Sequence, residues 1–501
     1  MSAAREVLPL ASSGGLKAQV VSALRWSAIA KFGGQLINWG ITLFVIRLLA
    51  PADYGLVAML TLIFMFLGML SDMGFGSSIV QSPTLDVHEI RQTFGAAIIV
   101  NLVICALLMV GAPAIAAFYG EPRLVDMTRV SALGFIGLGM VPVYAGLLQR
   151  EMRFKTTARI EIVTGVVGNL ITLYLAWSGF GAWALILGGL IAGPIRIVLL
   201  GVTASKFYWP SFGIRGTRRL WTFGGNLLIT RVVWYWSSQA DILIAAKFLG
   251  KEAVGFYSVA MHLASLPMQR AGGIINGVAF AAFAKIQHDR DAVASNTRLG
   301  VRLMALVTFP VLWGIAAVAP ELVEIAIGPA WTSSILPLTL VALSIPLRMI
   351  GSIISTTIMS MGRVDIAMVT TVIGAFIAPP LFYIGSHYGI VGLSVAWLGV
   401  TPTMFMLNMF RALPILGLSL RAVFVEIWRP MAIAGVMFCA VEGARRVLQL
   451  SDVPMFAVLV LLGAIVYGGG SLLLNRATSV EALTLLFPGR FARLRAPALV
   501  R

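Results

Sequence analysis

The chain has 501 residues, of which 59% are hydrophobic and 11% are charged. Soluble domains carry about 25% charged residues, so this composition excludes an ordinary water-soluble protein and predicts lipid as the main solvent. The formal net charge is +17. In a soluble chain such a surplus would suggest nucleic acid as a partner. In a membrane protein, basic residues collect in cytoplasmic loops, so no nucleic-acid partner is expected here.

Apolar segments follow one another along almost the whole chain. Residues 1–22 lack a continuous apolar core ending in a cleavage site, and we expect them to be a retained cytoplasmic tail. Each later segment is near the roughly 20 residues that cross a bilayer as a helix. In chain order the segments are 23–49, 54–71, 94–118, 127–148, 160–178, 180–203, 220–248, 254–282, 299–319, 335–361, 366–385, 389–411, 430–450 and 453–475. The sequence therefore predicts an all-α integral membrane protein with about 14 transmembrane helices.

The charges of the connecting loops support this arrangement. With the N-terminus in the cytoplasm, the cytoplasmic loops and tails hold 25 Lys and Arg residues, and the opposite loops hold 7. Cytoplasmic loops of membrane proteins carry such an excess, and a miscounted helix would scramble it from that point onward. We therefore expect both termini in the cytoplasm, with residues 476–501 as a basic cytoplasmic tail.

A weak internal repeat divides the chain. FGGQLI at 32–37 recurs as FGGNLL at 223–228, and RLLAPADYGLVAM at 47–59 is echoed by KFLGKEAVGFYSVAM at 247–261. The repeat spans six helices, an even number, so both copies enter the membrane from the same side. Repeats of this kind build transporters with a site at the interface of two lobes. The expected domains are an N-lobe at 23–203, a cytoplasmic linker at 204–219, a C-lobe at 220–411 and two further helices within 412–475.

Four of the predicted helices each carry one stripe of polar side chains. At 100° per residue, each stripe falls within an arc of about 60–100°. The members are Lys31, Gln35, Asn38 and Thr42; Thr222, Asn226, Thr230, Ser237 and Asp241; Ser258, His262, Ser265, Gln269 and Asn276; and Ser344, Arg348, Ser352 and Ser355. Lipid rejects such groups, so the stripes should face inward. Hydrogen bonding between helices is the alternative for Ser and Thr, whereas full charges favour a watered cavity.

Positive charge dominates inside the predicted helices. Asp241 is the one clear acid at mid-helix, and the cations there are Lys31, Arg196, Arg231, Arg270 and Arg348. Such a cavity suits a diphosphate or an acidic sugar, because the planar donor fork of arginine matches phosphate. The sequence predicts a cationic substrate site of Lys31, Arg231, Arg270 and Arg348, with Asp241 as a candidate for ion coupling. The expected polar lining of this cavity is Gln35, Asn38, Asn226, Thr230, His262, Gln269 and Ser344.

No catalytic signature accompanies these helices. The sequence contains no G-x-x-x-x-G-K-[ST] loop, nucleophile elbow or zinc motif. Cys105 and Cys439 lie inside apolar runs and are expected to be small packing residues. The protein is therefore not expected to be an enzyme, and neither a metal nor a cofactor is expected.

Two local motifs carry a family resemblance. The stretch from Arg47 to Gly55, RLLAPADYG, resembles an R-x-L-x-P-x-[DE]-[YF]-G turn between the first two helices. LSDMGFG at 70–76 is similar to a D-x-G-[FL] helix end. Both are typical of the polysaccharide-export flippases of the multidrug, oligosaccharidyl-lipid and polysaccharide (MOP) exporter superfamily. The resemblance implies two six-helix bundles plus two trailing helices, a MATE/MOP-like fold.

The resemblance also implies a function. Members of this branch translocate undecaprenyl-diphosphate-linked oligosaccharides across the bacterial inner membrane by alternating access, for lipopolysaccharide, capsule or exopolysaccharide assembly. The implied partners are the lipid-linked oligosaccharide, membrane lipids, and a polysaccharide polymerase with its chain-length regulator. Three alternatives stay open, one of which is a non-transporting scaffold for a synthesis complex. A cation-coupled multidrug antiporter of the same superfamily should carry acid-dominated helices, and a membrane polymerase or ligase should carry long outer loops.

Overall fold

The computed structural model describes residues 38–72, 74–81, 86–204, 208–213, 232, 235–236 and 238–474. Within helices, the side chains of 77, 81, 267–278 and 281 lie outside this description. Across the described ranges the regular elements are helices, and no strand occurs among them. Eleven of these helices are long and apolar enough to cross a membrane. The prediction of an all-α membrane protein is confirmed.

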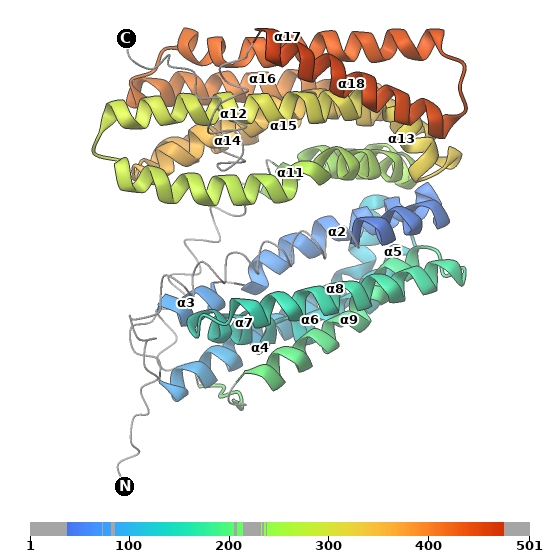
Figure 1. Ribbon diagram of the computed structural model, residues 1–501. Coiled ribbons are helices and arrows are strands. Elements are labelled where there is room, and N and C mark those ends of the chain that lie inside the picture. Colours follow the sequence, from blue (N-terminus) through green and yellow to red (C-terminus); the bar gives the residue numbers. More distant parts are fainter. Residues whose placement is uncertain are drawn as a thin grey trace. The chain divides into compact units, whose positions relative to one another are not determined.

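The helices follow one another with short connections (Figure 1). A short apolar helix, Asn38–Leu48, comes first, and residues 238–248 form another helical stretch. The labelled elements are α2 (Pro51–Asp72), α3 (Phe75–Gln81), α4 (Val87–Tyr119), α5 (Leu124–Ala132), α6 (Gly134–Leu138), α7 (Met140–Arg150), α8 (Phe154–Trp177), α9 (Ala182–Thr203), α11 (Gly250–Ile286), α12 (Arg290–Ala317), α13 (Ala319–Ala326), η2 (Pro329–Ser334), α14 (Ile335–Ser360), α15 (Val364–Ser386), α16 (Gly389–Leu416), α17 (Leu420–Val447) and α18 (Asp452–Leu474).

Eleven of the fourteen predicted segments coincide with the eleven candidate spans. The other three are 23–49, 220–248 and 254–282. Much of the first two lies outside the described residues, and the third corresponds to α11, many of whose side chains are not described. The number of fourteen therefore stays a prediction.

The chain forms two compact units, Met1–Gly255 and Phe256–Arg501. We call them unit 1 and unit 2 and describe each by itself. Residues 214–231, which hold part of the predicted linker and the start of the predicted C-lobe, lie outside the described residues. The lobe boundaries at 204–219 therefore remain predictions.

In unit 1, the ends of α2 and α4 follow from local sequence. Pro51 opens α2, where its fixed φ suits the first helical position, and the carboxylate of Asp53 accepts a hydrogen bond from the backbone N–H of Ala50 at 3.3 Å. Asp86 caps α4 by accepting from the N–H of His88, and Gly120 ends α4 in the left-handed region at φ 71°. The Pro51–Asp53 turn is therefore a helix-capping element.

The core of unit 1 is built from helices of low polarity. Phe94 of α4 and Tyr144 of α7 meet edge to face with ring centroids 4.9 Å apart, and Leu148 is fully buried beside them. One polar pair is enclosed as well: Ser71 donates to the side-chain oxygen of Asn101 at 2.7 Å. Burying these amide and hydroxyl groups is tolerable because each finds a partner.

In unit 2, α12 packs closely against α14 and α17, α14 packs against α16, α15 against α16, and α18 against α17. Among the described residues, Trp331 of η2 and Tyr257 of α11 are its largest fully buried side chains, both 0% exposed. These contacts fix α14 and α16 side by side, which matters for the site described below.

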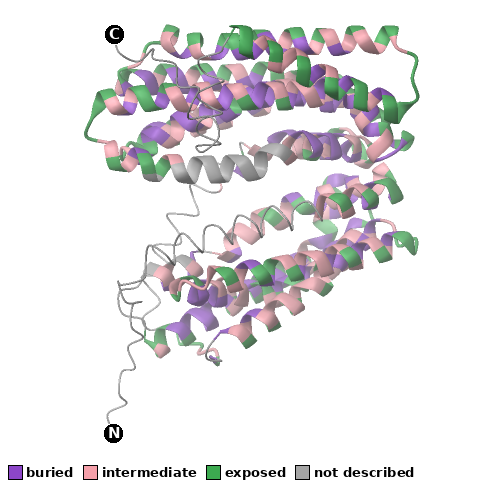
Figure 2. Ribbon diagram, viewed as in Figure 1, coloured by how far each residue is buried: buried purple, intermediate pink, exposed green. Residues whose placement is uncertain are grey.

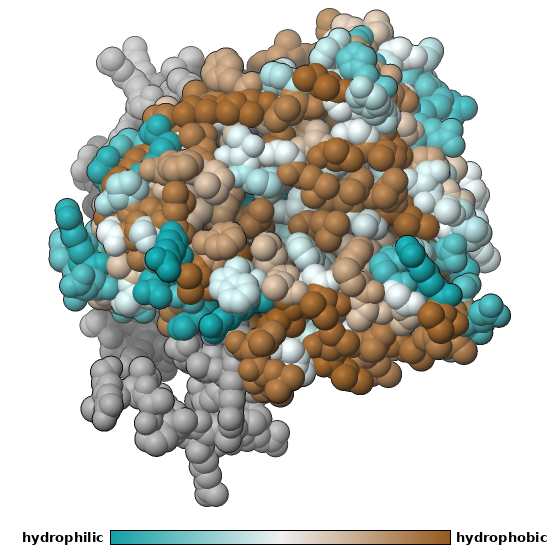
Figure 3. Space-filling model, turned by 90° about the horizontal axis from the view of Figure 1, so that it is seen from above, coloured by the Kyte–Doolittle hydropathy of each residue, from teal (hydrophilic) through white to brown (hydrophobic). Residues whose placement is uncertain are grey.

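The outer surface is apolar where lipid would lie. Val110 of α4, Val202 of α9 and Leu473 of α18 are more than 80% exposed. Exposed positions recur along the outer helices in Figure 2. Figure 3 shows one face on which apolar side chains occupy the middle and hydrophilic ones gather toward its ends. Such a surface is suited to hydrocarbon flanked by two aqueous layers.

Ion pairs hold α17 to its neighbours at two places. Near its C-terminal end, Arg445 donates to both carboxylate oxygens of Glu321 at 2.7 and 2.9 Å, and also contacts Glu442 at 2.5 Å. Near its start, Glu426 accepts from Arg298 of α12 at 2.8 Å. Only 9% of the Glu321 side chain is exposed, so its charge depends on Arg445.

Arg445→Ala should destabilise unit 2, because it leaves Glu321 as an enclosed carboxylate without its cation. Loss of one partner of a buried pair costs on the order of 3 kcal/mol. We expect a lower midpoint of thermal unfolding for the purified full-length protein in detergent. Arg446→Ala, at the neighbouring exposed position, is the control. Equal midpoints for the two variants would contradict the structural role of the cluster.

Candidate functional site

The structure describes five of the predicted site residues together with their side chains: Asn38, Asp241, His262, Ser344 and Arg348. Lys31, Gln35, Asn226, Thr230 and Arg231 lie outside the described residues. Gln269 and Arg270 fall on α11, but their side chains are not described. The four predicted cations therefore cannot be compared as a group, and Arg348 is the one whose surroundings are defined.

Arg348 lies near the middle of α14 and is exposed. Its guanidinium carbon is 5.6 Å from the centroid of the Trp397 ring, which comes from the middle of α16. A cation above the face of tryptophan is attracted by the negative charge of the ring face. The contact holds the guanidinium against the Trp397 ring, at a position that is exposed on α14.

The indole beneath Arg348 is itself fixed. Its Nε1 donates to the hydroxyl of Tyr257 on α11 at 2.8 Å, and its ring packs against Phe382 of α15 at 5.0 Å between centroids. Tyr257 and Phe382 are 0% and 1% exposed. Contacts from α11 and α15 thus orient the Trp397 ring on α16, and that ring in turn orients Arg348. We call Arg348, Trp397, Tyr257 and Phe382 the Arg348–Trp397 site.

The remaining polar side chains of the α14 stripe are largely used in packing. Ser344 is buried and donates to the carbonyl of Val341, and Ser352 donates to the carbonyl of Met349. Asn408 of α16 donates to Ser355 at 3.1 Å. The Asn408–Ser355 contact matches the alternative of hydrogen bonding between helices that the sequence left open for serine, whereas Ser344 and Ser352 bond to carbonyls of their own helix.

His262 belongs to the polar stripe that the sequence predicts on α11, and its side chain is described. It is exposed, and Ser265 donates to its backbone carbonyl at 3.0 Å. It lies five residues after Tyr257, so it is somewhat over one helical turn from the residue that holds Trp397.

In unit 1, some of the described polar side chains of the membrane helices pair between helices. Asn169 of α8 donates to the side chain of Asn38 at 2.8 Å. Arg196 of α9 lies 3.8 Å from the carboxylate of Glu161 on α8. Asp241 is 1% exposed. The expectation that Asp241 is the one clear mid-helix acid was wrong, because α8 begins at Phe154 and places Glu161 two turns inside the helix.

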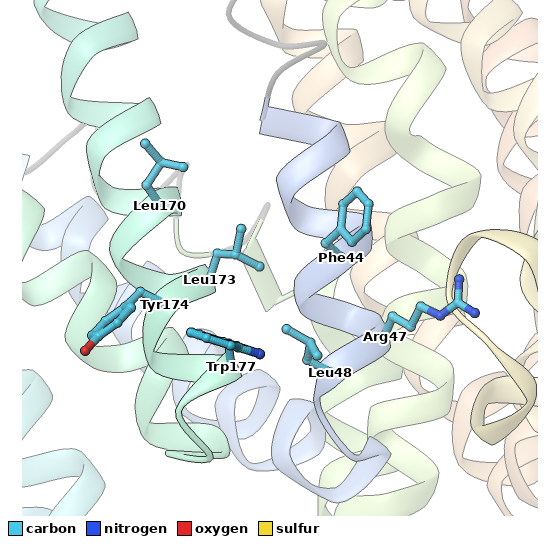
Figure 4. Close-up of a pocket in the computed structure, with 7 residues that line it drawn as sticks. All are labelled: Phe44, Arg47, Leu48, Leu170, Leu173, Tyr174 and Trp177. Atoms are coloured by element: carbon cyan, nitrogen blue, oxygen red, sulfur yellow. The ribbon is translucent and has the colours of Figure 1, made fainter.

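An apolar groove lies on unit 1 between the helix Asn38–Leu48 and α8 (Figure 4). It holds about 440 Å³ and is lined by Phe44, Leu48, Leu170, Leu173, Tyr174 and Trp177, with Arg47 at its edge. Figure 4 shows the Arg47 side chain directed away from α8. The groove has the apolar lining of a surface that hydrocarbon chains cover, and it offers no cluster of polar groups to a sugar.

Sequence reasoning missed Trp397, Tyr257, Asn169 and Glu161. Trp397 and Tyr257 stand in apolar runs, where an aromatic residue normally serves only in packing, and their hydrogen bond joins residues 140 positions apart.

Among the described residues, no group of three or more His, Cys, Asp or Glu side chains could hold a metal ion.

The fold and this site define a multi-pass, all-helical membrane protein with an exposed arginine inside a membrane span. A family model described as "Polysaccharide biosynthesis protein" matches residues 44–336, more than half of the chain, and the chain belongs to this family. The lipopolysaccharide biosynthesis protein WzxC of Escherichia coli (strain K12) is 27% identical over 421 residues, which cover 83% of this chain and 85% of WzxC.

Two solved structures share the fold. The lipid II flippase MurJ, in an inward closed conformation, matches with a TM-score of 0.75 over 90% of this chain and 99% of MurJ, at 13% identity. An inward-facing multidrug resistance MATE family transporter of the MOP superfamily matches with a TM-score of 0.60 over 77% of this chain and 96% of that transporter, at 15% identity. At these identities the likeness concerns the fold, and the expected MATE/MOP-like fold is confirmed.

Tyr257→Phe should weaken the support beneath Arg348. The substitution removes the acceptor for the indole N–H of Trp397, and an enclosed donor without a partner costs about 1–3 kcal/mol. We expect the purified protein to unfold at a lower denaturant concentration than wild type. Tyr388→Phe, at a tyrosine that is 77% exposed, should leave that midpoint unchanged. A midpoint for Tyr257→Phe equal to that of Tyr388→Phe would show that the hydroxyl does not hold the ring.

Proposed function

We propose that the protein is a transporter that moves an undecaprenyl-diphosphate-linked oligosaccharide across the bacterial inner membrane by alternating access. The transported unit serves lipopolysaccharide, capsule or exopolysaccharide biosynthesis. Support comes from the family to which the chain belongs, from its similarity to WzxC and from a fold shared with a lipid II flippase.

The single observation that carries the proposal is the exposed Arg348 at mid-helix beside Trp397. A charged side chain at the centre of a bilayer is costly in contact with lipid tails, and the exposure of Arg348 at this position supports a wet chamber. Arginine stays protonated and offers paired donors to phosphate oxygens. In the proposed cycle Arg348 binds the diphosphate head, while the prenyl tail remains in lipid.

Lys31, Arg231 and Arg270 complete the proposed cationic site, with Gln35, Asn38, Asn226, Thr230, His262 and Gln269 as its polar lining, while Ser344 is buried and bonds within α14. Their inclusion follows from the polar stripes of the sequence. Asp241, buried in unit 1, is our candidate for coupling the cycle to an ion. We propose that the protein itself performs no covalent chemistry, that both termini are cytoplasmic, and that a polymerase with its chain-length regulator uses the product.

The shared fold also raises a cation-coupled multidrug antiporter as a candidate. A cationic drug would meet Arg348 as a like charge, which disfavours its binding. The sign of this residue therefore favours an anionic substrate over a cationic one.

Arg348→Ala should abolish export of the surface polysaccharide that depends on this protein, at unchanged protein level in the membrane. The substitution removes the charge that faces the anionic head, and Arg348→Lys should retain part of the export because it keeps the charge without the planar fork. Lys31→Ala is expected to act in the same direction. The readout is surface polymer in a deletion strain complemented with each variant.

Arg363→Ala is the matched control, because Arg363 is exposed at the start of α15 and pairs with Asp365 outside the site. Wild-type export by Arg348→Ala, with the protein present at its normal level, would remove the residue from the proposed mechanism.

A further inference from the structure

The start of α2 crosses the start of α11 at unusually close range within unit 1. A Cβ atom at Gly55 would overlap the backbone carbonyl oxygen of Lys251. A Cβ atom at Gly255 would overlap the carbonyl oxygen of Pro51 and lie 3.2 Å from the backbone nitrogen of Gly55. Only glycine fits at both positions, because the two backbones touch directly. Small residues allow such close approach of helices in membranes.

The crossing is reciprocal with respect to the internal repeat. RLLAPADYG at 47–55 aligns with KFLGKEAVG at 247–255, so Gly55 corresponds to Gly255 and Pro51 to Lys251. Gly55 packs on Lys251 and Gly255 packs on Pro51, and these two partners occupy the same position in the two copies of the motif. Two copies of one motif related by a local twofold arrangement would produce this pattern.

Ionic contacts flank the crossing on the side of the turn between α4 and α5. The ammonium of Lys251 lies 2.7 Å from the carboxylate of Glu121. The ammonium of Lys247 donates to the carbonyl of Phe118 at 2.5 Å and lies 4.5 Å from the centre of its ring. The Lys251 side chain is 36% exposed, so water can reach this pair, and separating it costs little.

Further along α2, a third contact joins the same two parts of the chain. The Tyr235 hydroxyl donates to the carbonyl of Leu62 at 2.5 Å, and its ring lies 5.8 Å from that of Phe66. From Gly55 to Phe66 is 11 residues, about 16 Å along a helix. The contacts thus form a line along α2, which we call the α2 seam: Gly55, Leu62 and Phe66 of α2 and Tyr235, Lys251 and Gly255 opposite them.

We infer that the α2 seam is a closure that must separate during each transport cycle, with Gly55 and Gly255 as its contact point and Lys251–Glu121 as its latch. The seam joins corresponding parts of the two repeats, and by the predicted topology its glycine end lies on the extracytoplasmic side. It consists of backbone contact, a water-accessible ion pair and one buried hydrogen bond between neutral groups, so it can part without stranding a charge in hydrocarbon. The inference rests on the proposed translocation function.

Carbodiimide cross-linking tests whether the seam closes as described. The Glu121 carboxylate adds to the carbodiimide to form an O-acylisourea. The Lys251 amine then attacks the activated carbonyl carbon, an amide forms, and the carbodiimide leaves as a urea that carries the carboxylate oxygen. In the full-length protein in nanodiscs, we expect the 121–251 peptide pair by mass spectrometry. Gly55→Ala should reduce it to background, and Gly68→Ala, on the same helix with open space around it, should leave it unchanged. Equal yields for both variants would overturn the closure.

A reversible lock tests whether the seam must open. In a variant with Cys105→Ala and Cys439→Ala, Glu121→Cys and Lys251→Cys are bridged in cells with a reducible bis-methanethiosulfonate reagent. We expect polysaccharide export to stop and to resume after reduction, while each single cysteine variant with the reagent continues to export. Undiminished export by the bridged protein would overturn the inference.

These outcomes are separable from failure of the proposed function. The cross-link yield depends on the seam alone and needs no substrate. If the cross-link forms normally but Arg348→Ala exports normally, the anion site is contradicted and the seam is not. If Arg348→Ala loses export but Gly55→Ala cross-links as well as Gly68→Ala, the seam is contradicted and the anion site is not.

Discussion

The hydrocarbon core of the bilayer sets the constraint on which this structure depends: a polar group there needs a partner or water. Backbone N–H and C=O groups satisfy this constraint by hydrogen bonding to one another within the helices. Most described polar side chains meet it through neighbours, as in Asn38–Asn169, Ser71–Asn101 and Arg196–Glu161. Arg348 differs from these residues in being exposed, and its guanidinium rests on the ring of Trp397. That exposure is why we propose it as a substrate-binding residue.

The same constraint explains why the sequence was informative about the fold. Lipid demands long apolar runs, so the helices could be marked from composition and loop charge, and eleven predicted segments coincide with candidate spans. The start of α2 was also predictable, because proline suits the first helical position and a nearby acid caps a helix, whereas the close packing at Gly55 was not expected. In the structure Asp53 accepts from the N–H of Ala50, and Gly55 lies at a backbone crossing.

The site was less predictable because its determinants are distant in sequence. A polar stripe indicates which face of a helix avoids lipid, but it does not separate a cavity from a packed interface. Ser344 and Ser355, on the same stripe as Arg348, are occupied by hydrogen bonds. Trp397 and Tyr257 carried no polar signal. The predicted segment 160–178 began only one residue before Glu161, because apolar periodicity does not define where α8 begins. Packing between helices supplies this information.

The central claim is that Arg348 faces water at mid-membrane depth. Its most direct test is the reaction of Arg348→Cys, in a variant without Cys105 and Cys439, with a charged, membrane-impermeant thiol reagent applied to intact cells and to inverted vesicles. Because the thiolate is the reactive form, a cysteine in hydrocarbon stays unmodified. Phe376→Cys, near the middle of α15 at a position 76% exposed, is the lipid-facing comparison. The account predicts modification of Arg348→Cys from at least one side and none of Phe376→Cys. Equal inertness of both cysteines from both sides would contradict it.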